Sequence, residues 1–332
     1  MIQAFIKHIE YYLPKNALSN QELSTIFPDW DADKIYNKLG INNRFIAKKD
    51  ETASVLAIRA AELLFENNPV LKSDIDYIIY CTQSPDYFLP TSSCIIQDQL
   101  NLSIHCGAID INQGCSGYIY GLGLAKGLIA GGLAKNVLFL TAETYSKYIH
   151  HSDKSNRTIF GDAATATLIS DSGILKIDDM YFGTDGKGAK KLIVENGGAK
   201  NPKRTHSENE TNFDKKDFLF MDGPEVFNFT LEIVPILLKN TLEKNNLIQQ
   251  DIDYFIFHQA NKYLLDNLRK KINIPEEKFY NNIRDTGNTV SCTIPIAIKN
   301  TLLNNSLTSK NKILLAGFGV GFSWSGCILT FV

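Results

Sequence analysis

The sequence predicts an α/β fold built from two related halves, residues 1–172 and 173–332. Short apolar segments rich in β-forming residues alternate with segments whose apolar residues recur at helical spacing. The second half also repeats parts of the first at an offset of about 175 residues, a period too long for a solenoid. Two similar halves packed against each other explain this offset. The repeated pairs are DIDYIIYCTQ at 74–83 with DIDYFIFHQA at 251–260, and NVLFLTAETYS at 136–146 with NKILLAGFGVG at 311–321.

The individual elements are predicted from apolar runs and their spacing. Apolar, β-rich runs predict buried strands at 75–82, 108–111, 137–140 and 163–169. Helical spacing or small apolar composition predicts helices at 52–67, at 116–130 before a Gly-Gly stop, at 226–245, and from 258 onward. Residues 183–221 are rich in Gly, Lys, Asn and Glu, and we interpret them as a long surface excursion between the halves. Strands that alternate with helices favour a mostly parallel sheet covered on both faces.

The composition is that of a folded globular protein. Of the 332 residues, 44% are hydrophobic and 21% are charged, and the formal net charge is −2. This balance excludes wholesale disorder and disfavours nucleic acid or an anionic membrane as a partner of the whole surface. We find no stretch of eighteen apolar residues and no signal peptide, so no membrane span is expected.

The cysteines give no sign of a metal site or a disulfide framework. No CxxC pair occurs, and most of the thiols lie in apolar surroundings. Buried free thiols are typical of a cytoplasmic protein, which is the location we predict. The six are Cys81, Cys94, Cys106, Cys115, Cys292 and Cys327.

Cys115 is the strongest candidate nucleophile. It follows the predicted strand 108–111 and Gly114, and it stands at or just before the start of the helix 116–130. Unpaired N–H groups and the helix dipole favour a thiolate at such a position, so we expect a lowered pKa. The alternative is an inert core thiol, which is common in apolar surroundings.

Three further features resemble parts of an active site. His258 stands at the end of the repeated strand, at the sheet edge where α/β folds bind ligands; it could equally be a structural histidine. Asn288 follows a glycine in RDTGNTVSC, which suggests a sharp turn or simply a turn asparagine. The ending GFGVGFSW could direct backbone N–H groups at an oxyanion, or could form a plain hairpin.

Taken together, these motifs resemble the β-ketoacyl-acyl-carrier-protein (ACP) synthase III family of the thiolase superfamily. The resemblance runs nearly from end to end and keeps the family's order of blocks. These are YLPKNALSNQEL, GINNRFIAKKDETAS, LPTSSCIIQDQL, GCSGYIYGL, IFGDAATATLI, MDGPEVFNFT, FHQAN, GNTVSCTIPIA and GFGVGFSW. It implies a thiolase-like fold with layered α-β-α-β-α packing, which agrees with the repeat.

The resemblance implies a decarboxylating Claisen condensation in fatty-acid or specialised-lipid biosynthesis. Cys115 falls on the family's nucleophile, His258 on its histidine and Asn288 on its asparagine. Backbone N–H groups of Cys115 and Val320 would form the oxyanion hole. The acyl group would pass from acyl-CoA or acyl-ACP to Cys115 and then join malonyl-ACP. No cofactor and no metal are implied.

Binding residues are also implied by the resemblance. Asn261, Lys154, Gly223 and Phe227 would line the substrate and CoA channel. Phe88, Leu89, Phe160 and Phe318 would form the acyl pocket, with Phe88 and Leu89 closing the pocket of the partner in a homodimer. Arg269, Lys270 and Lys271 would dock the acidic carrier protein, although a solvated helix end is the alternative reading of these charges.

The sequence departs from the family at a few positions. Lys34 stands where CoA-binding members often carry tryptophan, with Trp30 one turn earlier; Tyr263 replaces an arginine, and Pro224 replaces a polar residue. We therefore expect an altered contact with CoA around an intact triad.

Other functions remain open at this point. GFGVG lacks the second cysteine of biosynthetic thiolases, and the HQAN and GFGVGFSW blocks look closer to synthase III than to chalcone-type synthases. One alternative is transfer of the acyl group to an oxygen or nitrogen acceptor without condensation. Another is a non-catalytic dimeric scaffold that binds carrier protein.

Overall fold

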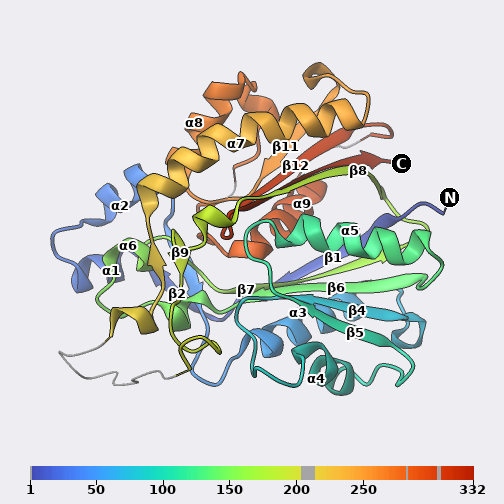
Figure 1. Ribbon diagram of the computed structural model, residues 1–332, viewed down its shortest axis with the longest axis horizontal. Coiled ribbons are helices and arrows are strands. Elements are labelled where there is room, and N and C mark those ends of the chain that lie inside the picture. Colours follow the sequence, from blue (N-terminus) through green and yellow to red (C-terminus); the bar gives the residue numbers. More distant parts are fainter. Residues whose placement is uncertain (1, 203–213, 282, 305–307) are drawn as a thin grey trace.

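The computed structural model describes residues 2–202, 214–281, 283–304 and 308–332 (Figure 1). One large sheet runs through this part of the chain in the strand order β11-β12-β13-β8-β1-β7-β6-β4-β5. Its strands are β1 (Phe5–Tyr12), β4 (Tyr77–Cys81), β5 (Gly107–Ile111), β6 (Asn136–Glu143), β7 (Ala163–Ser170), β8 (Leu175–Thr184), β11 (Tyr254–Phe257), β12 (Lys312–Gly319) and β13 (Ser323–Phe331).

Two small antiparallel pairs lie outside this sheet: β2 (Asn16–Ser19) with β3 (Asn43–Ile46), and β9 (Leu192–Ile193) with β10 (Phe220–Met221). The described helices are α1 (Asn20–Ile26), α2 (Ala32–Leu39), α3 (Ala53–Asn67), α4 (Ser92–Gln99), α5 (Gly117–Ala130), α6 (Lys154–Arg157), α7 (Gly223–Lys244), α8 (Lys262–Ile272) and α9 (Thr293–Asn304). The strands and helices predicted at 52–67, 75–82, 108–111, 116–130, 137–140, 163–169 and 226–245 are therefore confirmed, within a few residues at their ends.

Helices cover both faces of the sheet and also fill its middle (Figure 1). The central core joins side chains of α5 and α9 to strands of both halves. A second core packs α3 and α4 against β4, β6 and β7, and a third packs α7 and α8 against β11, β12 and β13. The layers are therefore α3/α4, strands, α5/α9, strands and α7/α8, and the predicted thiolase-like α-β-α-β-α packing is confirmed.

The repeated segments occupy equivalent places in the sheet. β4 pairs in parallel with β6, and its echo β11 pairs in parallel with β12. The two parts of the sheet meet where β1 pairs with β8 over Phe5–Lys176 and Ile6–Leu175. The proposed boundary at 172/173 falls in the turn between β7 and β8, and the division into halves at this point stays a prediction.

Two sequence-based expectations are wrong. The sheet is not mostly parallel, because β6–β7, β7–β1, β1–β8, β8–β13 and β13–β12 pair antiparallel. The connections from β6 to β7 and from β12 to β13 return beside the strand they leave instead of crossing over the sheet. The helix expected from 258 begins only at Lys262, since Asn261 accepts the N–H of Leu264 and caps it there.

Phe139 in β6 provides a test of the central core. Its side chain is fully buried, its ring stacks on Tyr118 at 5.3 Å between centroids, and it fills the space that a Cβ on Gly121 would need. Phe139→Ala should lower the free energy of unfolding by about 3–5 kcal/mol. Urea denaturation at fixed protein concentration measures this, with Leu133→Ala, at a 74% exposed position, as the control. Equal losses in the two variants would contradict this view of the core.

Candidate active site

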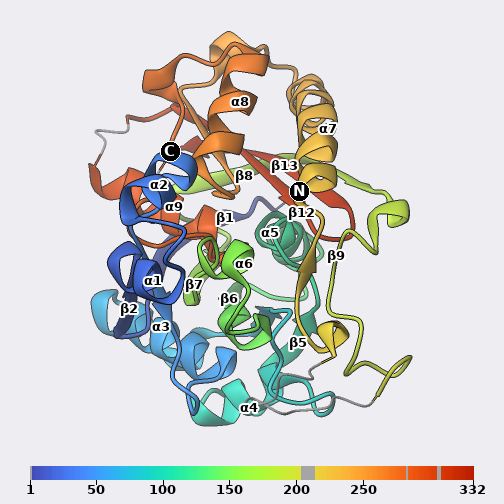
Figure 2. The same ribbon diagram turned by 90° about the vertical axis from the view of Figure 1, so that its left-hand side faces the viewer.

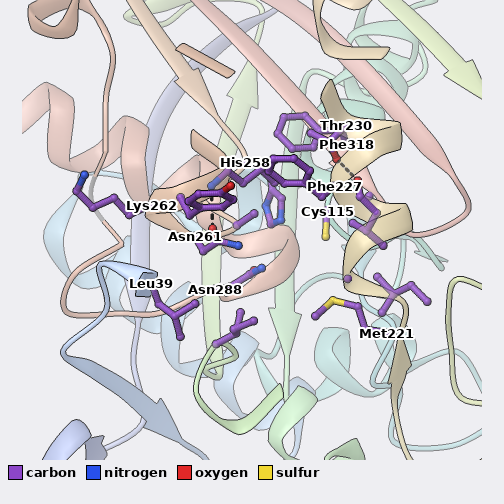
Figure 3. Close-up of a pocket in the computed structure, with 18 of the residues that line it drawn as sticks. Leu39, Cys115, Met221, Phe227, Thr230, His258, Asn261, Lys262, Asn288 and Phe318 are labelled. Carbon is purple, nitrogen blue, oxygen red and sulfur yellow. Dashed lines mark hydrogen bonds between the residues drawn. The ribbon is translucent and has the colours of Figure 1, made fainter. Parts of the chain in front are cut away.

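A cavity of about 680 Å³ opens beside the start of α5 and the end of β12. Cys115, His258 and Asn288 all line it, although they come from segments far apart in the sequence. Cys115 precedes α5, His258 follows β11, and Asn288 lies just before the 3-10 turn η7 (Val290–Cys292). Figure 3 shows the thiol, the imidazole and the carboxamide directed into the same space.

Cys115 is held between the start of α5 and the turn that follows β12. It is 6% exposed, and a Cβ on Gly319 would lie 2.8 Å from both Cβ and Sγ of Cys115, so only glycine allows this approach. The backbone N–H groups of Val320 and of Cys115 itself donate to the sulfur. These are the two N–H groups that the sequence suggested for an oxyanion hole.

The expected lowering of the Cys115 pKa is wrong. Burial raises the pKa of this thiol to about 12, and the hydrogen bonds from the backbone only partly oppose that effect. The apolar cover comes from side chains that include Phe160, Leu192 and Leu219. The thiol therefore carries its proton in the substrate-free protein, and it must lose that proton when it attacks.

The proton of the neutral His258 ring lies on Nδ1. The Thr293 hydroxyl donates its single proton to the Val290 carbonyl at 3.0 Å, so it can only accept from His258 Nδ1, at 2.8 Å. Burial lowers the pKa of His258 to about 3, which keeps the ring neutral near pH 7. Nε2 is therefore left with a free lone pair.

Asn288 is oriented by its own turn. The Val290 N–H donates to Asn288 Oδ1 at 2.9 Å, which leaves the Nδ2 donors free to face the cavity. The Asn288 backbone is pinned to the segment before β7, because its N–H donates to the Ile159 carbonyl at 2.9 Å and its carbonyl accepts from the Gly161 N–H at 3.0 Å. The carboxamide is thus a fixed hydrogen-bond donor.

Most of the other predicted binding residues line the same cavity: Asn261, Gly223, Phe227, Phe160 and Phe318. Lys154 does not. It pairs with Asp29, and its ammonium lies 5.3 Å from the centre of the Trp30 ring. Lys38, which does line the cavity, lies 5.1 Å from the same ring, so the Trp30 group adjoins the cavity mouth.

Phe88 and Leu89 lie apart from Cys115 within this chain. Both are on the surface, 85% and 82% exposed. Phe88 lines a second cavity of about 780 Å³, together with Val320, Tyr145 and Leu192, while Leu89 lines neither of these two cavities. Leu192 borders both spaces, so the second cavity lies on the other side of the wall beside Cys115.

Arg269, Lys270 and Lys271 form the last turn of α8, the helix whose first turn borders the cavity (Figure 2). Arg269 is engaged with Glu276 at 3.2 Å, whereas Lys270 and Lys271 are exposed.

Several site residues escaped the sequence analysis. Leu192 and Leu219 belong to the excursion 183–221, and they are buried in the same apolar cluster as Cys115 instead of lying on the surface. The apolar runs LIV at 192–194 and FLFM at 218–221 were the available signal; residues 203–213 of this excursion lie outside the described residues. Thr293 gave no signal, because its role depends on contact with His258.

Within the described ranges, no helix has the length and apolar character needed to cross a bilayer. Among those same residues, no cluster of histidine, cysteine or carboxylate side chains is arranged to hold a metal ion.

Comparisons with known proteins agree with this geometry. The family described as 3-oxoacyl-[acyl-carrier-protein (ACP)] synthase III matches residues 109–186, and its C-terminal part matches residues 242–331. The β-ketoacyl-[acyl-carrier-protein] synthase III of Campylobacter fetus subsp. fetus is 35% identical over 333 residues, covering 100% of this chain and 99% of the relative. That of Lactococcus lactis subsp. cremoris is 34% identical over 334 residues, 99% of each chain.

A crystal structure of a 3-oxoacyl-(acyl-carrier-protein) synthase III superposes with a TM-score of 0.93 at 45% identity, covering 99% of this chain and 100% of that one. With the fold and the site described above, this makes the protein an acyltransferase of the thiolase-like class. The chain belongs to the β-ketoacyl-ACP synthase III family.

Thr293→Val tests the hydrogen bond from His258 Nδ1 to the Thr293 hydroxyl. The variant loses that acceptor but keeps the Val290 carbonyl, to which the ring also hydrogen-bonds, so ¹⁵N NMR of the imidazole should show a changed Nδ1 signal. Turnover should fall about two- to tenfold, the range expected for one hydrogen bond. Thr293→Ser keeps the hydroxyl and is the control. An Nδ1 signal that is the same in Thr293→Val and wild type would contradict this contact.

Proposed function

We propose that the protein condenses an acyl group held on Cys115 with the two-carbon unit of malonyl-ACP, releasing CO₂. The observation that carries this proposal is the convergence of Cys115, His258 and Asn288 on one cavity, with the N–H groups of Val320 and Cys115 at the sulfur. The donor is acyl-CoA or acyl-ACP, and both thioesters are substrates rather than cofactors.

In the first step, the Cys115 sulfur attacks the thioester carbonyl of the donor. Its proton passes to His258 Nε2, the ring nitrogen that holds the lone pair. The carbonyl oxygen becomes an oxyanion that the N–H groups of Cys115 and Val320 stabilise. The tetrahedral intermediate then breaks its bond to the donor sulfur, and His258 Nε2 gives its proton to the departing thiolate, which leaves the ring neutral again.

In the second step, malonyl-ACP enters the same cavity. Asn288 Nδ2 donates to the malonyl thioester oxygen. His258 takes up a proton from water on Nε2 as negative charge develops on that oxygen, and it donates beside Asn288. The carbon–carboxylate bond breaks to give CO₂ and an enolate. The enolate carbon attacks the acyl carbonyl and displaces the Cys115 thiolate. His258 returns its proton to that sulfur, which restores the starting state.

The cavity supports binding of a long, thin thioester arm. Asn261, Gly223, Phe227, Phe160 and Phe318 all line it. Figure 3 shows Asn261, Phe227 and Phe318 around the space into which Cys115 points. Lys154 and Trp30 lie beyond the mouth, where the nucleotide end of CoA would emerge. In this proposal Lys154 therefore binds the nucleotide end of CoA at the rim of the cavity and does not form part of the channel wall.

A homodimer is part of the proposal. β5 forms one end of the large sheet, so one edge of its backbone lacks a neighbour within the described chain. Large apolar side chains are exposed near that edge, among them Phe88, Leu89 and Ile104 at 82–87%. Pairing through this surface would bring Phe88 and Leu89 toward the partner's acyl pocket.

Intact-mass spectrometry and CO₂ release test the two steps separately. Wild-type protein should gain the mass of an acyl group from acyl-CoA or acyl-ACP and then lose it to malonyl-ACP with release of CO₂. Cys115→Ala should gain no mass. Asn288→Ala should still become acylated but should decarboxylate about 10²–10³-fold more slowly, since it loses one oxyanion donor. An acyl adduct in Cys115→Ala would exclude Cys115 as the nucleophile. Acyl transfer without CO₂ would favour an oxygen or nitrogen acceptor instead.

Lys270 and Lys271 are proposed, with Arg269, to dock the acidic carrier protein. Reversing both lysines to glutamate should raise KM for malonyl-ACP severalfold at low salt and leave acylation from acyl-CoA unchanged. The matched control is Lys239→Glu with Lys244→Glu, which makes the same charge change at exposed sites on α7. Equal KM values in the two double variants would show that α8 plays no special part.

A further inference from the structure

Glu143, the last residue of β6, is a buried carboxyl group that the proposed reaction does not use. Its side chain is fully buried, and no ion pair reaches it within the described residues. Burial raises the pKa of Glu143 to about 8, so the group is largely neutral near pH 7. Burying a polar group is costly unless it is hydrogen-bonded, so the hydrogen bonds of Glu143 are the contacts to consider.

One side of Glu143 holds the turn that carries Asn288. The Ser291 hydroxyl donates to Glu143 Oε1 at 3.1 Å, and Ser291 is 1% exposed. Ser291 directly follows Val290, whose φ of +55° is a left-handed conformation that a β-branched side chain resists. The hydrogen bond to Glu143 therefore anchors a turn that is under strain.

This strained turn orients both Asn288 and His258. The Val290 N–H fixes the Asn288 carboxamide, and the Val290 carbonyl takes the proton of the Thr293 hydroxyl that accepts from His258. A relaxed Val290 would rotate this peptide and release both contacts. Any group that holds Val290 in place thus acts on two side chains of the candidate site.

The other side of Glu143 holds the segment that follows β4. The backbone N–H of Gln83 donates to both carboxylate oxygens at 3.1 and 3.2 Å, and the Ser84 hydroxyl donates to Oε2 at 2.9 Å. This segment adds no contact to Asn288 or His258. Ser84 and Ser291 therefore bind the same carboxylate from opposite sides with similar geometry and burial.

We propose that Glu143 is a positioning residue for the condensation step, which it supports through Ser291 by holding the Val290 turn. The proposal rests on the proposed function, because its effect is defined on decarboxylation of malonyl-ACP. Self-acylation of Cys115 uses His258 but not Asn288, so loss of this turn should slow it less than decarboxylation, which uses both side chains. The Ser84 hydroxyl, which donates to Glu143 and accepts from the Thr144 N–H, holds the Gln83 segment and the end of β6 instead of this turn.

Ser291→Ala and Ser84→Ala form a matched pair of variants, because each removes one hydroxyl from the same carboxylate. Ser291→Ala should lower kcat for decarboxylation by about fivefold or more, with KM for malonyl-ACP near wild type and a smaller loss in the rate of self-acylation. Ser84→Ala should keep kcat within about twofold. Thermal unfolding of both variants reports any shared loss of stability.

Glu143→Gln and Glu143→Ala complete the test. Glutamine keeps the shape of the side chain and one acceptor oxygen that the Ser291 hydroxyl can still reach, so it should retain more of the decarboxylation rate than alanine, which removes that acceptor. If Glu143→Ala does not fold, the comparison of Ser291→Ala with Ser84→Ala still tests the proposal. Equal kcat values for Ser291→Ala and Ser84→Ala, or a Ser291→Ala variant that loses self-acylation and decarboxylation alike, would overturn the proposal.

The wild-type protein separates this proposal from the function on which it rests. A wild type that shows neither an acyl adduct nor CO₂ release refutes the proposed function, and it also refutes the proposed role of Glu143, which is defined on that reaction. A wild type that performs both steps while the serine variants behave alike refutes only the role of Glu143.

Discussion

The peptide group of Val290 is the constraint on which the candidate site depends. Its N–H is bound by Asn288 and its carbonyl by Thr293, which in turn accepts the proton of His258 Nδ1. A non-glycine residue in the left-handed region costs on the order of 1–2 kcal/mol. The surrounding hydrogen bonds and the complete burial of the Val290 side chain hold the turn against that cost. Two side chains from different segments thus owe their orientation to one strained residue.

The site needs segments that are far apart in the sequence. Cys115 lies before α5, whereas His258, Asn288 and Val320 follow α7, and side chains of α5 and α9 share the central core. Close contact between α5 and the end of β12 depends on small residues: a Cβ on Gly317 would lie 2.9 Å from Cα of Ser116, and one on Gly319 would meet Cys115. These glycines therefore allow β12 and the loop after it to approach the start of α5, and that approach brings the Val320 N–H to the sulfur.

Much of this arrangement was predictable because it depends on local patterns. The apolar runs predicted most of the strands and the repeat predicted two similar halves, whereas the five layers were implied by the family resemblance. The same resemblance implied most of the residues that line the cavity, but not Lys154, Phe88 or Leu89, which lie outside it. The direction of strand pairing was not predictable, because the 144–162 connection is long enough to cross the sheet but contains only the short helix α6 and returns beside β6. The tautomer of His258 depends on a threonine 35 residues away.

The pKa of Cys115 is the clearest example of a property that the neighbouring sequence could not predict. A position before a helix favours a thiolate, but the dielectric around the sulfur is set by Leu192 and Leu219, which arrive from the excursion between the halves. Their burial of the thiol outweighs the helix and the two N–H groups. The same low dielectric strengthens those N–H dipoles toward any oxyanion that forms beside them. Burial therefore disfavours a Cys115 thiolate in the substrate-free protein but strengthens the stabilisation of the charged intermediate. The site holds little charge until a thioester binds and His258 Nε2 accepts the thiol proton.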